Sequence, residues 1–323
     1  MRNLVNKLET PMTGLDAAVW KSRLIQLTQE LGSYRALGKN HFATFIQQTP
    51  TLLVTFETVQ GIRALSSTAQ PFGFDMVRAR NWSHLCIISN GDTWFRDPAI
   101  YAYFDELIDE GFFDEYQRVL FYGAGPCGYA AAAYSVASPG STVVVVQPQA
   151  TLDARLAEWD PRFPEMRRTS FRDRFGYAPD MLDAAQQAFV LYDPREEYDA
   201  MHAALFARSN VTRLRLPFMG AALQTQLMDM EILYPLLTLA GLGKLDARSF
   251  YRMYRARRDN VNYLRNLMGH LDKIERPYLN MLLCRNVITR KNAPKFRRRL
   301  DQLEKAAEDG EFDFPADAQS AAQ

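Results

Sequence analysis

The residues best suited to chemistry lie in a glycine-rich segment, GAGPCG, at positions 123–128. The segment follows the apolar run VLFYG and precedes an alanine-rich stretch, an order that predicts a strand, a tight turn and a helix. A nucleophile elbow is built in this way, because its apex is strained and small neighbours let the helix approach the strand. When the pattern Gly-x-Ser-x-Gly is laid on residues 123–127, the nucleophile position falls on Gly125, which has neither a hydroxyl nor a thiol.

A register shifted by two residues gives a different chemistry. It places Cys127 at the start of the helix, where the helix dipole lowers the pKa of a thiol and stabilises the thiolate. This hypothesis is a cysteine-dependent hydrolase or acyl/thiol transferase that uses Cys127 with Asp193 and His202. Tyr129 argues against the shifted register, since it would stand where a small side chain is needed. The alternative for Cys127 is a small residue packed between helix and strand.

The same glycines formally match the dinucleotide-binding pattern Gly-x-Gly-x-x-Gly, at Gly123, Gly125 and Gly128. That pattern also needs an acidic residue at the end of the next strand to hold a ribose, and the run VVVVQP offers Gln147 there. A phosphate-binding P-loop is excluded, because no Gly-Lys-Ser/Thr follows. We therefore predict no cofactor, and the three glycines stay candidates for ligand binding at the turn.

A hydrolase elbow also needs an acid and then a histidine later in the chain. Asp193 follows the run FVLY, where the acid belongs, but it also suits a helix cap, and Asp153 is a second candidate with the same ambiguity. The histidine should follow the run VTRLRLP, yet the next residues are FMGA. His202 precedes that run, in DAMHAALF, which equally fits a helix face packed on a sheet. The remaining histidines suggest no base: His41, His84 and His270.

Apolar runs that alternate with helical patterns must position these residues. Such runs are typical of parallel strands that helices cover on both faces. The sequence therefore predicts an α/β fold with a mostly parallel, doubly wound sheet. Residues 16–48 are predicted to be helical, with Gly32 as a plausible stop, and Asp97-Pro98 is predicted to begin a helix. The predicted strands are LLVTFE (52–57), HLCIIS (84–89), VLFYG (119–123), VVVVQP (143–148), FVLYDP (189–194) and VTRLRLP (211–217).

The string FYGAGPCGYAAAAYS, followed by VVVVQPQATLD, resembles the elbow and next strand of α/β-hydrolase-fold proteins. The resemblance covers residues 50–220 and implies the fold rather than a reaction. The chain is also similar to uncharacterised alphaproteobacterial proteins, through LLVTFET, NWSHL, DTWFRD, YGYAPDM and YDAMHAALF. Such proteins often carry the label phosphoadenosine phosphosulfate reductase. That family needs a Ser-Gly-Gly-x-Asp-Ser loop and a C-terminal Glu-Cys-Gly-x-His cysteine, and neither string occurs here.

The C-terminal part of the chain is strongly basic. Residues 244–305 hold 17 Lys and Arg against 6 Asp and Glu, a net charge of +11, whereas the whole chain is at +1. Arg297, Arg298 and Arg299 are candidates for binding a polyanion through counterion release. Alternatively, these charges lie on solvated helix faces, or they contact a protein partner or a second subunit of a homo-oligomer. The predicted domains are a hydrolase-like domain at 1–220, a basic helical segment at 221–305 and a disordered tail at 306–323.

Composition and the remaining motifs bound the function. The chain has 323 residues, of which 47% are hydrophobic and 23% charged, as in soluble globular proteins. It contains no membrane-spanning run or secretory signal, so a cytoplasmic location is predicted. Its three cysteines have no CxxC spacing and predict neither a zinc site nor a disulfide framework.

Aromatic residues near the strand ends suggest a pocket. Trp94 and Tyr122 could stack on a small molecule or a glycan at the mouth of the sheet, whereas Trp82 is better placed in the core. Taken with the missing nucleophile and base, these residues favour a binding or accessory protein that lacks Ser-His-Asp chemistry. The alternative is an enzyme that uses Cys127.

Overall fold

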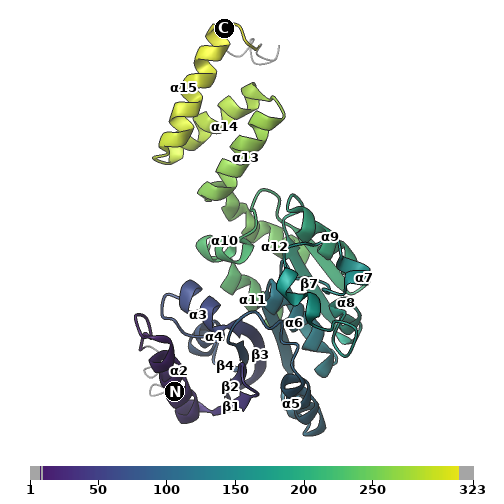
Figure 1. The fold of residues 1–323 in the computed structure, drawn as a ribbon. Helices are drawn as coiled ribbons and strands as arrows, with labels where there is room; N and C mark the ends of the chain where they lie inside the picture. The colour runs from purple at the N-terminus through teal and green to yellow at the C-terminus, as the bar shows by residue number, and fades with distance from the viewer. Residues whose placement is uncertain (1–7, 9, 313–323) are drawn as a thin grey trace. The chain divides into compact units, whose positions relative to one another are not determined.

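A computed structural model describes residue 8 and residues 10–312 of the chain. Within these residues, eight strands form one sheet in the order β1-β2-β4-β3-β5-β6-β7-β8 (Figure 1). Strand β2 runs antiparallel to both of its neighbours, and all other neighbouring strands are parallel. The strands are β1 (Ser33–Leu37), β2 (His41–Ile46), β3 (Thr49–Thr58), β4 (Trp82–Ser89), β5 (Arg118–Ala124), β6 (Thr142–Val146), β7 (Gln187–Tyr192) and β8 (Val211–Arg215).

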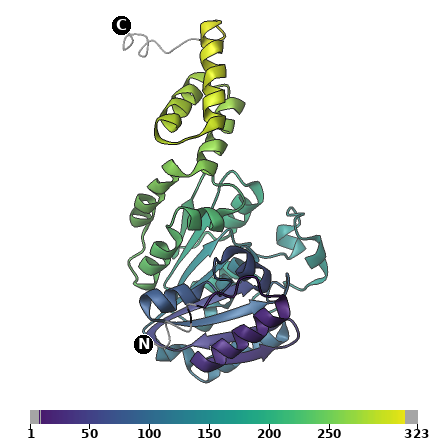
Figure 2. The ribbon, with the colours of Figure 1, turned by 90° about the vertical axis from the view of Figure 1, so that its left-hand side faces the viewer.

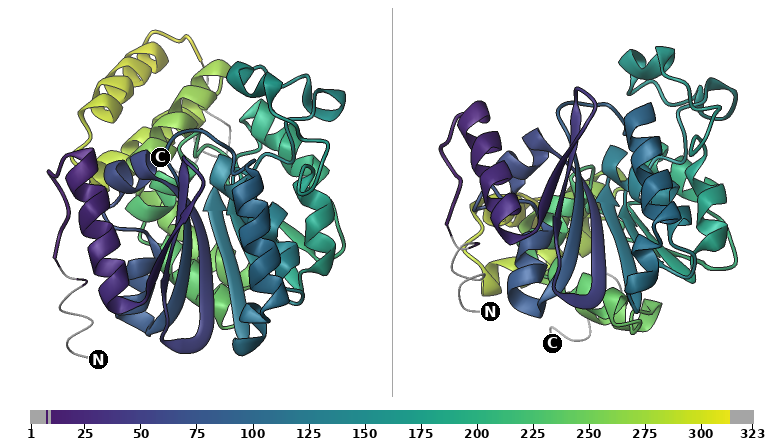
Figure 3. Two further views of the ribbon diagram at one scale, coloured as in Figure 1. Left: turned by 60° about the horizontal axis from the view of Figure 1, so that its bottom comes forward. Right: turned by 90° about the horizontal axis from the view of Figure 1, so that it is seen from below.

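Helices cover both faces of the sheet, and Figure 3 shows α2 and α5 on opposite sides of it. One apolar core lies between the sheet and α5, α6 and α8, and a second core lies between the sheet and α2, α3 and α4. The helices of this part are α2 (Ala17–Leu31), α3 (Val59–Leu65), α4 (Gly73–Arg80), α5 (Pro98–Asp109), α6 (Pro126–Tyr134), α7 (Ala154–Ala157), α8 (Ala178–Met181), α9 (Glu197–Leu205), α10 (Leu223–Asp229), α11 (Leu233–Gly241) and α12 (Ala247–Met253). Short 3-10 helices lie at η1 (Phe112–Glu115), η2 (Ser135–Ala137), η3 (Pro164–Arg168), η4 (Leu182–Ala184) and η5 (Tyr254–Asp259).

The six predicted strands are confirmed as β3 to β8, and the sheet is mostly parallel as predicted. The helix predicted to begin at Asp97-Pro98 is α5, in which the Asp97 side chain accepts a hydrogen bond from the Ala99 N–H and Pro98 is the first helical residue. These elements were predictable because each is specified by neighbouring residues, namely an apolar run, a cap or a proline.

For residues 16–48, the predicted stop at Gly32 is confirmed, whereas the helix predicted for the residues after it is wrong. Helix α2 ends at Leu31, and the chain then forms a hairpin of β1 and β2 that turns at Gly38, where φ is +66°. Gly32 ends the helix because a Cβ at this position would collide with the carbonyl group of Phe45 on β2. Strand β1 is short and largely exposed, so it has no apolar run to reveal it.

The described chain divides into two compact units, which differ from the predicted domains. Residues 221–255, with helices α10 to α12, belong to the sheet unit, whereas the described residues 218–220 and 256–312 belong to the other. Apolar side chains of α10 and α11 are buried, whereas the helices of a solvated basic segment would leave most of their side chains exposed. The predicted boundary at residue 220 therefore does not coincide with the division by packing.

The second unit contains α13 (Val261–Lys273), α14 (Pro277–Arg290) and α15 (Pro294–Glu308), drawn in light green to yellow in Figure 2. Its core includes Leu264, Met281, Phe296 and Leu300. The predicted disordered tail begins at residue 306, but α15 continues to Glu308, and residues 313–323 lie outside the described residues. In the described part of the chain, no helix is both long and apolar enough to cross a bilayer.

Candidate functional site

The turn between β5 and α6 has the geometry of a nucleophile elbow. Its apex is Gly125, with φ +55° and ψ −128°, and α6 begins at the next residue. This is a conformation that residues with side chains rarely adopt. A Cβ added at Gly125 would meet no heavy atom within 4 Å, so a side chain here would project into open space. The register that places Gly125 at the nucleophile position therefore agrees with the backbone.

Gly123 and Gly128 let α6 approach β5. A Cβ at Gly123 would collide with the carbonyl oxygen of Cys127, and one at Gly128 would lie 3.2 Å from the carbonyl oxygen of Gly123. The two glycines thus have a packing role, whereas the sequence made them candidates for ligand binding. Close helix–strand approach is what an elbow requires of its small neighbours.

Pro126 stands where hydrolases of this fold have a backbone N–H that contributes to the oxyanion hole. In hydrolases of this fold, the backbone N–H of the residue after the nucleophile is one donor of the oxyanion hole. Proline has no N–H, so the residue that follows Gly125 cannot supply this donor. The turn therefore lacks both a nucleophile and one of the groups that stabilise a tetrahedral intermediate.

Asp193, the predicted acid, is buried at the end of β7 and accepts a hydrogen bond from the Arg195 N–H at 2.9 Å. Asp153, the second candidate, caps α7 and is paired with Arg155. Hydrogen bonds from Arg155 lower the pKa of Asp153 to about 2, so it is ionised at neutral pH. Asp153 therefore has the capping role that the sequence left open, whereas Asp193 bonds within the turn before α9, whose N-cap residue is Glu196.

His202, the predicted base, is fully buried on α9 and both of its ring nitrogens have partners. Nδ1 accepts from the Ala150 N–H at 3.2 Å, and Nε2 lies 3.0 Å from Oδ2 of Asp160. A ring that accepts at Nδ1 donates from Nε2, so the neutral ring fits both contacts. Burial alone would raise the pKa of Asp160, but hydrogen bonds from His202 and Arg162 lower it. His202 is thus bonded away from Cys127, and the predicted Cys127–Asp193–His202 arrangement is not assembled.

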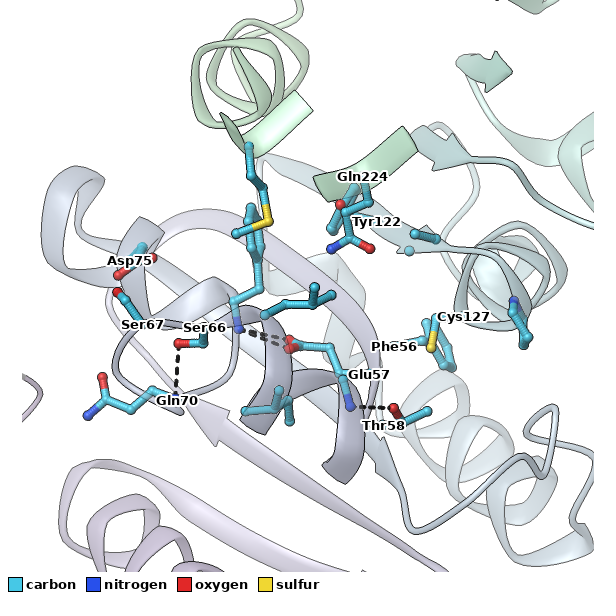
Figure 4. A pocket seen from close by; sticks show the side chains of 18 of the residues that line it. Phe56, Glu57, Thr58, Ser66, Ser67, Gln70, Asp75, Tyr122, Cys127 and Gln224 are labelled. Carbon is cyan, nitrogen blue, oxygen red and sulfur yellow. Dashed lines mark hydrogen bonds between the residues drawn. The ribbon is translucent and has the colours of Figure 1, made fainter. Parts of the chain in front are cut away.

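The elbow opens on a cavity of about 490 Å³ at the carboxyl ends of β3 and β5. Figure 4 shows Glu57, Tyr122 and Cys127 around it. Neither Asp193 nor His202 lines this cavity. Other lining residues come from α3, α4 and the helices after the sheet, and include Phe72, Asp75, Gln224 and Tyr234.

The Cys127 thiol reaches the cavity but is not activated there. Burial raises its pKa well above the ordinary range, and the charges of Glu57 and Asp92 raise it further. These effects oppose the helix dipole, which the sequence predicted would lower this pKa. Cys127 is therefore a protonated thiol at neutral pH.

Glu57 is a cavity residue that the sequence prediction missed. Its carboxylate accepts hydrogen bonds from the Phe72 N–H at 3.0 Å, the Thr55 hydroxyl at 2.8 Å and the Cys86 thiol at 3.3 Å. Burial raises the pKa of Glu57 in spite of these donors. A glutamate that ends the apolar run LLVTFE was the available signal, because a charged residue seldom continues the apolar pattern of a buried strand.

Glu57, His84 and Cys86 also have the donor atoms of a zinc site, and these atoms lie within 4.8 Å of one another. The Thr55 hydroxyl, however, donates to Glu57 and lies 2.9 Å from Nε2 of His84. Burial lowers the pKa of His84 to about 3, so the ring is neutral. Hydrogen bonds through Thr55 therefore connect Glu57 with His84, whereas Nδ1 of His84 is buried and has no hydrogen-bond partner within the described residues.

Of the predicted aromatic residues, Tyr122 lines the cavity and Trp94 does not. Trp94 is buried against Tyr129, Phe163 and Phe171. Trp82 is also buried, as predicted. The Tyr122 hydroxyl is buried and has no hydrogen-bond partner within the described residues. An unsatisfied buried hydroxyl is costly and marks a position where a ligand could bind.

The predicted polyanion residues lie on α15 in the helical unit. Arg297 and Arg298 are exposed, whereas Arg299 is paired with Asp272 at 2.6 Å. The three arginines therefore differ: the first two are available to a partner, and the third also joins α15 to α13.

No protein-family model and no curated protein matches the chain. Among solved structures, the carboxylesterase EstE1 from a metagenomic library is similar, with TM-score 0.42, 13% identity and coverage of 71% of this chain and 97% of that one. The capsule O-acetyltransferase of Neisseria meningitidis serogroup A has TM-score 0.39, 12% identity and coverage of 57% and 85%.

A third similar structure is a chain of the Glycosylation Associate Protein (Gap123) complex from Streptococcus agalactiae. It has TM-score 0.42 and 10% identity, over 65% of this chain and 47% of that one, so the match spans about half of its length. At such identities the likeness concerns the fold alone. By its strand order, its reversed β2 and the elbow at Gly125, the chain has an α/β-hydrolase-like fold.

Proposed function

We propose that this protein is a binding or accessory protein without Ser-His-Asp chemistry, and that it holds a small organic ligand in the elbow cavity. The observation that carries the proposal is the sequence of Gly125 and Pro126 at the apex, which supplies neither a nucleophile nor an oxyanion N–H. The segment after β8, Phe218–Gly220, contains no histidine. Loss of one triad residue lowers kcat by a factor of roughly 10⁴ or more.

The cavity supports a binding role. Its volume of about 490 Å³ suits a small organic molecule. Phe72 stacks on Tyr234 at 4.7 Å between ring centroids and packs against Tyr122, which makes an aromatic wall. Glu57 and Gln224 add polar groups that could orient a ligand. Aromatic walls with few polar groups are typical of small-molecule sites.

Ligand binding is tested with three probes of one shape: benzylammonium, benzyl alcohol and benzoate. We expect at least one to raise the Tm in a concentration-dependent way. Cys127 projects into the cavity, so Cys127→Phe should fill it and abolish the shift, whereas Cys127→Ala should retain it. If no probe binds, or if Cys127→Phe binds as the wild type does, the proposed site is wrong.

Hydrolysis is tested with p-nitrophenyl acetate. We expect the wild type and Cys127→Ala to release nitrophenol at the same rate as an equal concentration of unfolded chain. Turnover by the wild type that Cys127→Ala abolishes would instead support the alternative, a cysteine-dependent hydrolase or acyl/thiol transferase. The observation in favour of that alternative is that Cys127 lines the cavity.

The alternative also predicts a reactive thiol. A raised pKa leaves Cys127 protonated, and a protonated thiol is a poor nucleophile. We expect iodoacetamide at neutral pH to alkylate Cys127 far more slowly in the folded protein than in urea. Fast alkylation of the folded protein that is absent in Cys127→Ala would favour the enzyme.

Other assignments extend the proposal. Arg297 and Arg298 are proposed to bind a polyanion or a protein partner. A second copy of the chain in a homo-oligomer is the alternative partner for these two arginines. The proposed location is cytoplasmic. We do not propose phosphoadenosine phosphosulfate reductase activity, because its substrate is an anion. The described residues that line the cavity include no Lys or Arg to bind such an anion.

A further inference from the structure

The charged residues of the elbow cavity all have one sign. Among the described residues that line it are the carboxylates Glu57, Asp75 and Asp92, and no Lys, Arg or His. A cleft lined by charges of one sign concentrates ligands of the opposite sign and repels those of the same sign. The cavity thus disfavours an anionic ligand before any particular contact is considered.

The three carboxylates differ in how they are compensated. Asp75 is paired with Arg78 and accepts a hydrogen bond from the Tyr234 hydroxyl. Asp92 is exposed to solvent. Glu57 is half-buried, and its donors are all neutral: an N–H, a hydroxyl and a thiol. A carboxylate that is partly withdrawn from water without a cation is costly, and a cationic ligand would compensate it.

The Tyr122 hydroxyl supplies a second, independent observation. Tyr122 is 3% exposed, lines the same cavity and has no hydrogen-bond partner within the described residues. Burial, and then the charge of Glu57, raise its pKa well above the ordinary range, so it is a neutral phenol. Its oxygen can accept an N–H from a ligand, which an ammonium group provides and a carboxylate does not.

We propose that the ligand of the elbow cavity is an organic cation, an ammonium group on an apolar body. The ammonium would bind the Glu57 carboxylate and the Tyr122 phenol oxygen, and the apolar body would pack on the rings of Phe72 and Tyr234. This inference rests on the proposed binding function and specifies the class of ligand. The cavity would then select its ligand by positive charge as well as by shape.

The experiment compares benzylammonium, benzyl alcohol and benzoate by isothermal calorimetry at neutral pH. These molecules share a ring and differ in charge. We expect the ammonium to bind at least tenfold more tightly than the alcohol, since hydrogen bonds to charged groups are about twice as strong as neutral ones. We expect no measurable binding of benzoate.

Three variants locate the effect. Glu57→Gln should weaken ammonium binding at least tenfold and leave alcohol binding within about twofold. Tyr122→Phe should weaken ammonium binding while keeping the ring. Asp109→Asn neutralises an exposed carboxylate at the end of α5, outside the cavity lining, and should bind all three probes as the wild type does.

The outcomes separate this inference from the proposed function. If benzoate or the alcohol binds as tightly as the ammonium, the cavity is a ligand site but the charge selectivity is wrong. If Glu57→Gln has no more effect than Asp109→Asn, the proposed contact is wrong, provided that circular dichroism shows a folded variant. If none of the probes binds, both proposals fail.

Discussion

The Thr55 hydroxyl lies 2.9 Å from Nε2 of His84 and thereby links this buried ring to Glu57 at the cavity. Residues 55 and 57 on β3 and residues 84 and 86 on β4 share one face of the sheet, because side chains alternate along each strand. The His84 ring also lies directly against α4, because a Cβ at Gly73 of that helix would collide with it. The hydrogen bonds through Thr55 therefore connect α4 with the cavity.

His84 should make the fold sensitive to acid. Its pKa is about 3 in the folded chain against 6.5 for an ordinary histidine, because burial disfavours the charged ring. The unfolded chain therefore takes up this proton first as the pH falls below 6.5, and the stability that His84 contributes is lost between pH 6.5 and 3. The full effect is at most about 5 kcal/mol.

Urea unfolding at several pH values tests this prediction. We expect His84→Gln to be less stable than the wild type at neutral pH, but to lose less stability between pH 6.5 and 3. Parallel pH profiles for the two proteins would contradict the assignment.

Tyr122→Phe should stabilise the ligand-free protein by about 1 kcal/mol, because it removes a buried hydroxyl that has no partner. Tyr134→Phe is the matched control. Tyr134 is also buried, but its hydroxyl donates to the Phe95 carbonyl oxygen at 2.6 Å, so its loss should destabilise by about 1 kcal/mol. Chemical denaturation measures both. Equal signs for the two variants would show that the Tyr122 hydroxyl is satisfied.

Gly123→Ala should destabilise the fold by about 3 kcal/mol, because the added methyl group meets the backbone of α6 at Cys127. Gly140→Ala is the control, since φ is +82° there and a Cβ would have no neighbour within 4 Å. It should lose about 1 kcal/mol through backbone strain alone. Similar losses in the two variants would mean that α6 can move away from β5.

Gly125→Ser should fold without gaining esterase activity. The side chain has space, and the strained apex should cost about 1–3 kcal/mol of stability. The new hydroxyl would have no histidine in the segment directly after β8, Phe218–Gly220, and no N–H at Pro126 to stabilise an oxyanion. Stopped-flow assays with p-nitrophenyl acetate measure burst and turnover. An acyl-enzyme burst absent from the wild type would show that the remaining groups suffice for catalysis.

The paired substitution Arg297→Ala and Arg298→Ala should weaken retention on heparin, because both residues are exposed. The salt dependence of binding should fall by about one unit per arginine. The control replaces Arg213 and Arg215 on β8, which are also exposed, and should elute with the wild type. If both pairs of substitutions weaken retention equally, heparin binds through the overall positive charge rather than through Arg297 and Arg298.

The sequence alone determined the elements that are encoded locally. Six strands, the start of α5 and the elbow with glycine at its apex follow from apolar runs, a cap and small residues within a few positions. The sequence left the nucleophile position open between Gly125 and Cys127, and the backbone conformation of Gly125 decided it. The exposed strand β1 escaped prediction because its pattern carries no apolar signal.

Only the tertiary structure decided which side chains meet. The pairing of Thr55 with Cys86 across β3 and β4 brings Glu57 and His84 into one network, although Thr55 and His84 lie 29 positions apart in sequence. The contact between Nε2 of His202 and the Asp160 carboxylate likewise directs the ring away from the elbow. Residues distant in sequence come together through strand register and helix packing, and these depend on the sum of many contacts across the fold rather than on any local pattern.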